Sequence, residues 1–158
     1  MGDYAQQVFK TKNGLKFITN ICYEVLHANH IYSQIKKLNE RPQFMINLTN
    51  DSWFGKVEPY QHLYLTRWRS LEFALPMIRA TNTGISTLIY QDGSLGKMLE
   101  VFKRGNLDLK LPLDRIHQTF YEKFGHYSFL ILAFIWLAVL LLIEKLKSVL
   151  DRPLKTHV

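Results

Sequence analysis

An uninterrupted apolar run near the end of the chain constrains the fold more than any other feature. Residues 127–143 read YSFLILAFIWLAVLLLI, and no acidic or basic residue lies between His126 and Glu144. Roughly 17–25 apolar residues cross a bilayer as a helix, so this run lies at the short end of that range. The core helix of a soluble protein would show a polar face, and this run shows none. The pattern therefore predicts one transmembrane helix over residues 126–146.

The basic residues around this run predict its orientation. Those that follow it outnumber those that precede it within reach: Lys145, Lys147, Arg152 and Lys155 against Arg115 and Lys123. By the positive-inside rule, the basic tail (147–158) is cytoplasmic and the body (1–125) faces the outside. The first sixteen residues, MGDYAQQVFKTKNGLK, contain no apolar core and are not a signal peptide, so they do not explain how the body would cross the membrane.

The rest of the 158-residue chain is long enough for one ordinary domain. Its formal net charge of +7 is compatible with binding to nucleic acid or to anionic lipid. Only residues 67–70 (RWRS) form a tight basic cluster outside the tail, so we expect a lipid surface and no nucleic acid. The single cysteine excludes an internal disulfide and does not reveal the compartment.

Apolar spacing predicts strands that alternate with helices, which favours an α/β layered fold. We expect strands over 15–24, 44–50 and 106–113, the last because Leu107, Leu109 and Leu111 alternate with polar residues. A strand over 84–90 should form a hairpin through the turn at Asp92-Gly93. Helices are expected over 30–40 and 60–79, the second bent or ended by Pro76. One face of this second helix should carry Leu63, Arg67, Leu71, Ala74 and Leu75.

Cys22 ends the first apolar strand and is followed directly by Tyr23 and Glu24. A lone cysteine is most often a small buried hydrophobic residue. A cysteine on a sharp turn at a strand end is instead a position for a nucleophile, with the next backbone N–H available to an oxyanion. Both readings are open from the residues alone.

Several short motifs favour the interpretation of Cys22 as a nucleophile. CYE (22–24), NLTNDSWFG (47–55), QH (61–62), RSLEFALPMIRATNTGIS (69–86) and DGSLG (92–96) occur in this order. Together they resemble the nitrilase superfamily, and more closely its membrane branch, the apolipoprotein N-acyltransferases. The likeness runs from about residue 14 to the membrane helix.

The resemblance implies part of a nitrilase-like α-β-β-α sandwich followed by one C-terminal transmembrane helix, held at the bacterial inner membrane with the catalytic domain in the periplasm. It implies that Cys22 takes an acyl chain from a phospholipid as a thioester and passes it to the N-terminal amine of a lipoprotein. Tyr23 would offer its backbone N–H to the oxyanion, and Glu24 would support the turn. Trp53 and Phe54 would line the loop near the acyl chain, where aromatic surface suits an apolar tail.

The chain also departs from the family pattern. The family uses a Glu–Lys–Cys triad whose glutamate (the base) and lysine lie well upstream of the cysteine. The residues before Cys22 include no glutamate, and Lys10, Lys12 and Lys16 are too close to the strand to match the family's lysine. We therefore expect the C-terminal part of an apolipoprotein N-acyltransferase, inactive by itself, with a separate chain as one source of the other half.

Other polar residues favour structural roles. His27 and His30 lack a third ligand at metal spacing, so no zinc or other cofactor is expected. His62 is interpreted as a packed or capping histidine, and Glu58 and Glu72 as solvated or ion-paired carboxylates. Two alternatives to the acyltransferase remain: a nitrilase-like amidase for small amides, and a tail-anchored interaction module in which Cys22 is only buried.

Overall fold

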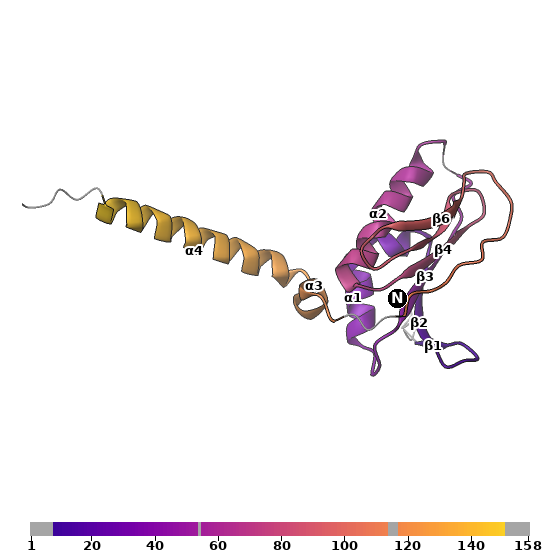
Figure 1. Cartoon of the computed structure of the whole chain (residues 1–158), viewed down its shortest axis with the longest axis horizontal. Helices are drawn as coiled ribbons and strands as arrows, with labels where there is room; N and C mark the ends of the chain where they lie inside the picture. Colours follow the sequence, from indigo (N-terminus) through magenta and orange to yellow (C-terminus); the bar gives the residue numbers. More distant parts are fainter. Residues whose placement is uncertain (1–7, 54, 114–116, 151–158) are drawn as a thin grey trace, which may run out of the picture. The chain divides into compact units, whose positions relative to one another are not determined.

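Six strands form one mixed sheet in the order β1-β2-β3-β4-β5-β6 (Figure 1). Strands β2, β3 and β4 run parallel, β1 pairs antiparallel with β2, and β4, β5 and β6 pair antiparallel in turn. The strand bounds are Phe9–Lys10 (β1), Lys16–Ile21 (β2), Phe44–Thr49 (β3), Met77–Thr81 (β4), Ser86–Ile89 (β5) and Leu95–Leu99 (β6).

This computed structural model describes residues 8–53, 55–113 and 117–150, in two compact units, Met1–Lys123 and Phe124–Val158. The sheet belongs to the first unit. In the second unit, helix α4 (Tyr127–Leu150) contains a stretch, Tyr127–Ser148, that is long and apolar enough to cross a membrane, with a mean hydropathy of 2.5. It covers the apolar run and continues past Glu144, beyond the predicted end at residue 146.

Two helices provide the parallel crossovers and cover the same face of the sheet (Figure 1). Helix α1 (Ala28–Lys36) joins β2 to β3, and α2 (Glu58–Phe73) joins β3 to β4. The core lies between this face and the helices, and it is the largest source of folding free energy in the unit. Its fully buried side chains include Ile18, Met45 and Met77 from the strands and Ile31 and Phe73 from the helices.

The opposite face of the sheet is only partly covered. Phe17, Ile46 and Ile78 are half-buried there, while Ile21 and Leu48 are exposed at the end of β2 and β3. These residues follow the two-residue period of a strand, so their side chains share one face. An apolar face of this kind is typical of a layer that packs against another layer.

The prediction of a helix over 60–79 is wrong in its second part. Helix α2 ends at Phe73, because Ala74 adopts a left-handed conformation (φ 44°) and Pro76 follows two residues later. Residues 77–81 then form β4 beside β3. Of the residues predicted to share one face of this helix, Leu63 is buried whereas Leu71 is 40% exposed.

The segment 106–113 is not a strand, contrary to prediction. Its alternation is nevertheless real, because Leu107, Leu109 and Leu111 are half-buried while Asn106, Asp108 and Lys110 are exposed. Leu107 and Leu109 line a hollow together with Ile78 and Ala80, on the partly covered face of the sheet. The segment therefore packs its leucines against the sheet without joining its hydrogen-bond ladder.

The other predicted elements are confirmed with small shifts. The strand predicted over 15–24 stops at Ile21, where a short helix, η1 (Cys22–Leu26), begins. The helix predicted over 30–40 is α1, and the hairpin is β5–β6, whose turn places Gly93 at φ 74°. Such a positive φ costs glycine nothing, which explains the Asp-Gly sequence.

Candidate active site

Cys22 lies at the carboxyl end of β2, where the strand turns abruptly into η1. Its backbone has φ 50°, in the left-handed region that costs a non-glycine residue roughly 1–2 kcal/mol. The side chain is half-buried, with no disulfide. Strained backbone at the end of a strand is where a nucleophile is commonly presented.

The two residues after Cys22 stabilise this turn. The Ile21 N–H donates to Glu24 Oε2 at 2.7 Å, which satisfies a backbone donor that the strand leaves free. The ring of Tyr23 stacks on His62, with centroids 5.1 Å apart and planes 19° from parallel. Burial is the largest cause that raises the pKa of Tyr23, followed by the charges of Cys22, Asp51 and Glu58.

A buried guanidinium lies under this edge of the sheet. Arg79, on β4, is 1% exposed and donates to Asp51 Oδ2 at 2.9 Å. It also donates to Asn47 Oδ1 on β3 at 2.5 Å and to Thr66 Oγ1 on α2 at 3.4 Å. Burial lowers the pKa of Arg79, while Asp51 and Cys22 act in the opposite direction. A charge in this position is tolerated only because partners from three elements surround it.

Asn47 joins this cluster to the Cys22 turn. Its side-chain amide donates to the backbone oxygens of Asn20 and Cys22, at 3.2 and 3.3 Å. Its own oxygen accepts from Arg79. Asn47 therefore links the Arg79 guanidinium to the backbone carbonyl of the strained residue Cys22.

Asp51 contacts the side chains of His62 and Arg79, and the backbone of Gly84 lies close to its carboxylate. Its Oδ1 lies 3.1 Å from His62 Nδ1, and the same ring nitrogen lies 3.2 Å from Arg79 Nη2, so the tautomer of His62 decides which of the two groups it bonds. Burial raises the pKa of Asp51, but the His62 hydrogen bond and the Arg79 charge outweigh it, so the net pKa lies below its ordinary value. A Cβ on Gly84 would lie 2.0 Å from Asp51 Oδ2, so only glycine fits there.

The rim of this site is apolar and open. Trp53 lies in the loop after β3 and is 76% exposed, and Ile21 and Leu48 are exposed at the carboxyl ends of the neighbouring parallel strands β2 and β3. Phe54, the other predicted acyl-chain residue, lies outside the described residues. The predicted residues Cys22, Tyr23, Glu24 and Trp53 thus all follow the carboxyl ends of β2 and β3.

Sequence reasoning missed the Asp51–His62–Arg79 cluster as a unit. Asp51 and Arg79 were noted only as parts of the motifs NDSWFG and RATNTG, and no role was predicted for either residue. The interpretation of His62 as a packed histidine is confirmed, since it is 4% exposed and bound to Asp51. Ion pairing of Glu72 is also confirmed, by Arg69 Nη2 at 2.8 Å.

The basic cluster at 67–70 is engaged within the fold. Arg67 donates to the Gly93 carbonyl at 2.6 Å, and Arg69 is 9% exposed and donates to the Leu26 carbonyl at 3.4 Å. These contacts make both arginines structural. As for metals, no group of three His, Cys, Asp or Glu side chains is close enough to hold an ion in the part of the chain that the structure describes.

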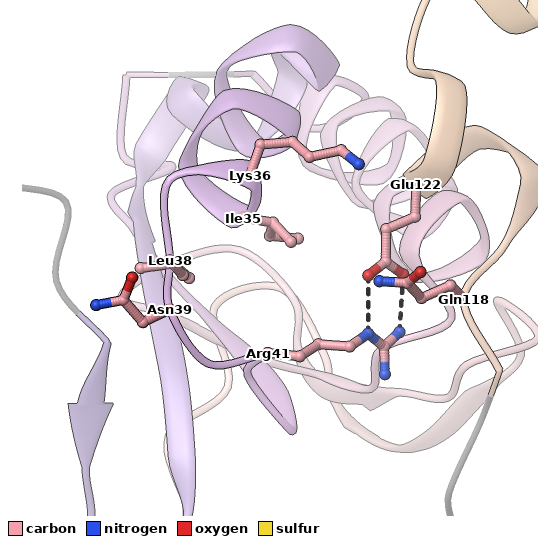
Figure 2. A pocket seen from close by; sticks show the side chains of 7 residues that line it. All are labelled: Ile35, Lys36, Leu38, Asn39, Arg41, Gln118 and Glu122. Atoms are coloured by element: carbon pink, nitrogen blue, oxygen red, sulfur yellow. Dashed lines mark hydrogen bonds and ion pairs between the residues drawn. The ribbon is translucent and has the colours of Figure 1, made fainter.

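A second hollow, of about 260 Å³, lies at the amino ends of the parallel strands (Figure 2). Arg41, which precedes β3, forms two parallel hydrogen bonds with Glu122 at 2.8 and 2.9 Å and a third to the Phe73 carbonyl at 2.8 Å. Glu122 belongs to the short helix α3 (Phe120–Phe124) and is 1% exposed. The hollow is therefore built around an attachment of α3, at the opposite edge of the sheet from Cys22.

Comparisons with known proteins agree with this architecture. The sequence model of the family described as carbon-nitrogen hydrolase matches residues 1–126. Among solved structures, an amidase from Nesterenkonia sp. AN1 is similar with a TM-score of 0.56, 17% identity, and coverage of 78% of this chain and 46% of that one. Nit3 of Saccharomyces cerevisiae gives a TM-score of 0.53 at 17% identity, over 66% of this chain and 40% of that one. At these identities the likeness shows the nitrilase fold.

Curated relatives are more similar in sequence. An apolipoprotein N-acyltransferase of Haemophilus ducreyi is 36% identical over 87% of this chain and 26% of its own length. One of Bradyrhizobium diazoefficiens is 40% identical over 79% of this chain and 22% of its own. The chain thus spans about a quarter of the length of these relatives.

Proposed function

Since the chain belongs to the carbon-nitrogen hydrolase family, we propose that it is the Cys-bearing C-terminal part of an apolipoprotein N-acyltransferase, with Cys22 as the nucleophile. The observation that carries the proposal is the position of Cys22, on a left-handed turn at the carboxyl end of β2, beside an open apolar rim. The names of its curated relatives support the choice of reaction.

The proposed reaction has two steps, acylation of Cys22 and transfer of the acyl group. The Cys22 thiolate attacks the ester carbonyl of a phospholipid, the C–O bond breaks, and the lysophospholipid leaves with a proton on its oxygen. The α-amine of a lipoprotein then attacks the thioester, an amide forms, and the thiol is regenerated. In both steps the Tyr23 N–H would donate to the oxyanion, the role that the family resemblance implies for the backbone amide that follows the nucleophile.

The proton acceptor for Cys22 is proposed to lie outside this chain. Two carboxylates of this region are already engaged: Glu24 accepts from the Ile21 N–H, and Asp51 binds Arg79 and His62. A thiol is a weaker nucleophile than a thiolate, and a base positioned to take its proton is what activates it. A glutamate and a lysine from another polypeptide region, as in the family's triad, would activate it.

The roles of the remaining predicted residues follow from their positions. Trp53 and Phe54 would contact the acyl chain in the loop after β3, where Trp53 is 76% exposed. Glu24 would keep the turn in place through its bond to the Ile21 amide. Aromatic side chains offer large apolar area at small entropic cost, which suits an acyl tail.

We further propose a domain of residues 1–125, a membrane span over 126–146 and a cytoplasmic tail over 147–158. The body would face the periplasm from the bacterial inner membrane, as the excess of basic residues after the span favours. Phospholipid would be the acyl donor and a lipoprotein the acceptor. The polypeptide that supplies the glutamate and lysine would also carry the body across the membrane.

Acylation of Cys22 tests the proposal. The chain is incubated in detergent with a fluorescent phospholipid, alone and together with the preceding region of a relative such as the Haemophilus ducreyi protein. We expect a hydroxylamine-sensitive label only when both polypeptides are present, and none with Cys22→Ser. The matched control is Ser33→Ala, because Ser33 is an exposed residue of α1 away from the turn.

Other outcomes of the same experiment discriminate between the alternatives. Release of ammonia from small amides without a lipid adduct would favour the amidase. No adduct and no amide hydrolysis under either condition would favour an interaction module. A label on the isolated chain would contradict the proposal that its activating groups lie elsewhere.

A further inference from the structure

Helix α2 presents apolar side chains on both of its sides. One side packs into the core through Leu63, Thr66 and Phe73. The other side is exposed, although its residues recur at spacings of three and four and therefore form one continuous line along the helix. We call this line the outer stripe; it consists of Val57, Tyr60, Tyr64, Leu65, Trp68 and Leu71, each 40–62% exposed.

The composition of the outer stripe differs from that of the open sheet face. The sheet face carries Phe17, Ile46 and Ile78, which have no polar atoms in their side chains and are suited to a dry interior. The outer stripe instead carries tyrosines and a tryptophan, which combine apolar rings with polar tips. Such residues concentrate at the boundary between hydrocarbon and water. The two surfaces are therefore suited to different partners.

The stripe itself carries no charge that would oppose contact with lipid. From Tyr60 to Leu71 the helix contains no carboxylate. Arg67, whose guanidinium lies 5.9 Å from the centre of the Tyr64 ring, already donates to the Gly93 carbonyl and interacts with the Asp92 carboxylate. The aromatic rings, rather than Arg67, are therefore the groups suited to a headgroup layer.

A short connection to α4 would keep the body close to a membrane that α4 crosses. Helix α3 ends at Phe124 and α4 begins at Tyr127, so Gly125 and His126 alone connect the two helices. The three chain steps from Phe124 to Tyr127 reach at most roughly 10 Å. If α4 spans a bilayer, the folded body is held within that reach of the headgroups.

We propose that the outer stripe of α2 lies in the headgroup layer of the membrane that α4 spans. The partner is a phospholipid surface, contacted by the tyrosine and tryptophan rings of the stripe. The proposal requires α4 to span the membrane but does not depend on any chemistry of Cys22.

Tryptophan fluorescence of the full chain in vesicles tests this. The chain has three tryptophans, so Trp53→Phe with Trp136→Phe leaves Trp68 on the stripe, and Trp53→Phe with Trp68→Phe leaves Trp136 in α4. The vesicles contain phosphatidylethanolamine and phosphatidylglycerol, with or without bromine on the acyl carbons next to the headgroup. We expect brominated lipid to remove most of the Trp68 emission, and iodide in the water to quench it only weakly.

Several results would overturn the proposal. Strong quenching of Trp68 by iodide but not by brominated lipid would mean that the stripe faces water. Protection from both quenchers, with a dependence on the protein-to-lipid ratio, would mean that a second copy covers it. Failure of lipid brominated at the chain centre to quench Trp136 would mean that α4 does not span, which removes the basis of the proposal while leaving the acylation test unaffected.

Two further variants provide controls. Phe9→Trp, in a chain whose three tryptophans are replaced by Phe, places the reporter on the opposite face of the sheet, since Phe9 pairs and stacks with Phe17. This reporter should be quenched by iodide. Leu65→Glu adds a carboxylate to the stripe and should weaken quenching of Trp68 by brominated lipid; unchanged quenching would contradict the proposal.

Discussion

The arginine beneath the Cys22 turn determines how single substitutions act in this region. Arg79 is 1% exposed and has partners on β3, on α2 and in the loop that contains Asp51. Removing one partner of a buried ion pair leaves the other without compensation, which costs about 3–5 kcal/mol. The cluster is therefore sensitive to the loss of any one of its members.

Asn47→Ala should destabilise the body. The substitution removes the donor to the Asn20 and Cys22 carbonyls and the acceptor for Arg79, which leaves buried polar groups unsatisfied at about 1–3 kcal/mol. Urea unfolding of the full chain in detergent measures the change. Asn29→Ala, at an exposed position of α1, should stay within about 0.5 kcal/mol. Equal effects of the two variants would refute the structural role of Asn47.

The stability contribution of Asp51 should depend on pH. Its pKa in the folded protein is below the ordinary value of 3.8, so its ionised form stabilises the fold at all pH values above the ordinary pKa. The contribution is lost as the pH falls through the folded pKa, because the carboxylate then becomes protonated. Asp51→Asn should therefore lower the free energy of unfolding by about 3 kcal/mol at pH 7, and the difference from the native chain should shrink as the pH falls below the ordinary pKa of 3.8.

Unfolding curves at pH 7 and at successive acidic values check this prediction. The matched control is Asp108→Asn, because Asp108 is exposed in the 106–113 segment. A difference between native and Asp51→Asn chains that stays constant with pH would be inconsistent with an ionised, stabilising Asp51.

The position of Cys22 could be predicted from sequence, whereas the cluster beneath it could not. An apolar run that stops before Cys22 predicts a strand end from local pattern alone. Asp51 and Arg79 are 28 positions apart, and they meet only because α2 returns the chain to the neighbouring parallel strand. Such a contact depends on the crossover, and no local period reveals it.

At the scale of elements, two boundaries depended on tertiary contacts. The apolar pattern of α2 continues through Pro76 and Met77 without a change of period, so the helix predicted from it extends past the observed end. Its actual end is a left-handed Ala74, followed by pairing of β4 with β3. The leucines at 107–111 alternate as in a strand, but the segment lies over the sheet face, where no neighbouring strand offers a free edge.

Arg41→Met should loosen α3. Glu122 would lose both of its bonds to Arg41 and remain buried without a cation, so the helix should separate from the body more often. Hydrogen exchange of the amides of residues 117–124 should accelerate, while that of β3 should not. Lys37→Met, a loss of the same charge at an exposed position, is the control. Unchanged exchange at 117–124 would show that the ion pair does not hold α3.

At the scale of the whole molecule, the chain covers about a quarter of the length of its curated relatives. The sheet face with Phe17, Ile46 and Ile78 is only partly covered within this chain. At roughly 25 cal/mol per Å², several hundred Å² of uncovered apolar surface corresponds to on the order of 10 kcal/mol, similar to the stability of a domain. Under the proposed function, the second sheet of the α-β-β-α sandwich would cover such a face, and the polypeptide that supplies it would complete both the core and the active site.

The most direct measurement is the mass of the peptide that contains Cys22. The chain is purified from membranes after co-expression with the preceding region of a relative, digested, and analysed with and without hydroxylamine. The account predicts a mass increase equal to one fatty acyl group on the Cys22 peptide, removed by hydroxylamine and absent without the co-expressed region. An acyl group on another residue, or an unmodified Cys22 peptide in the complete complex, would contradict it.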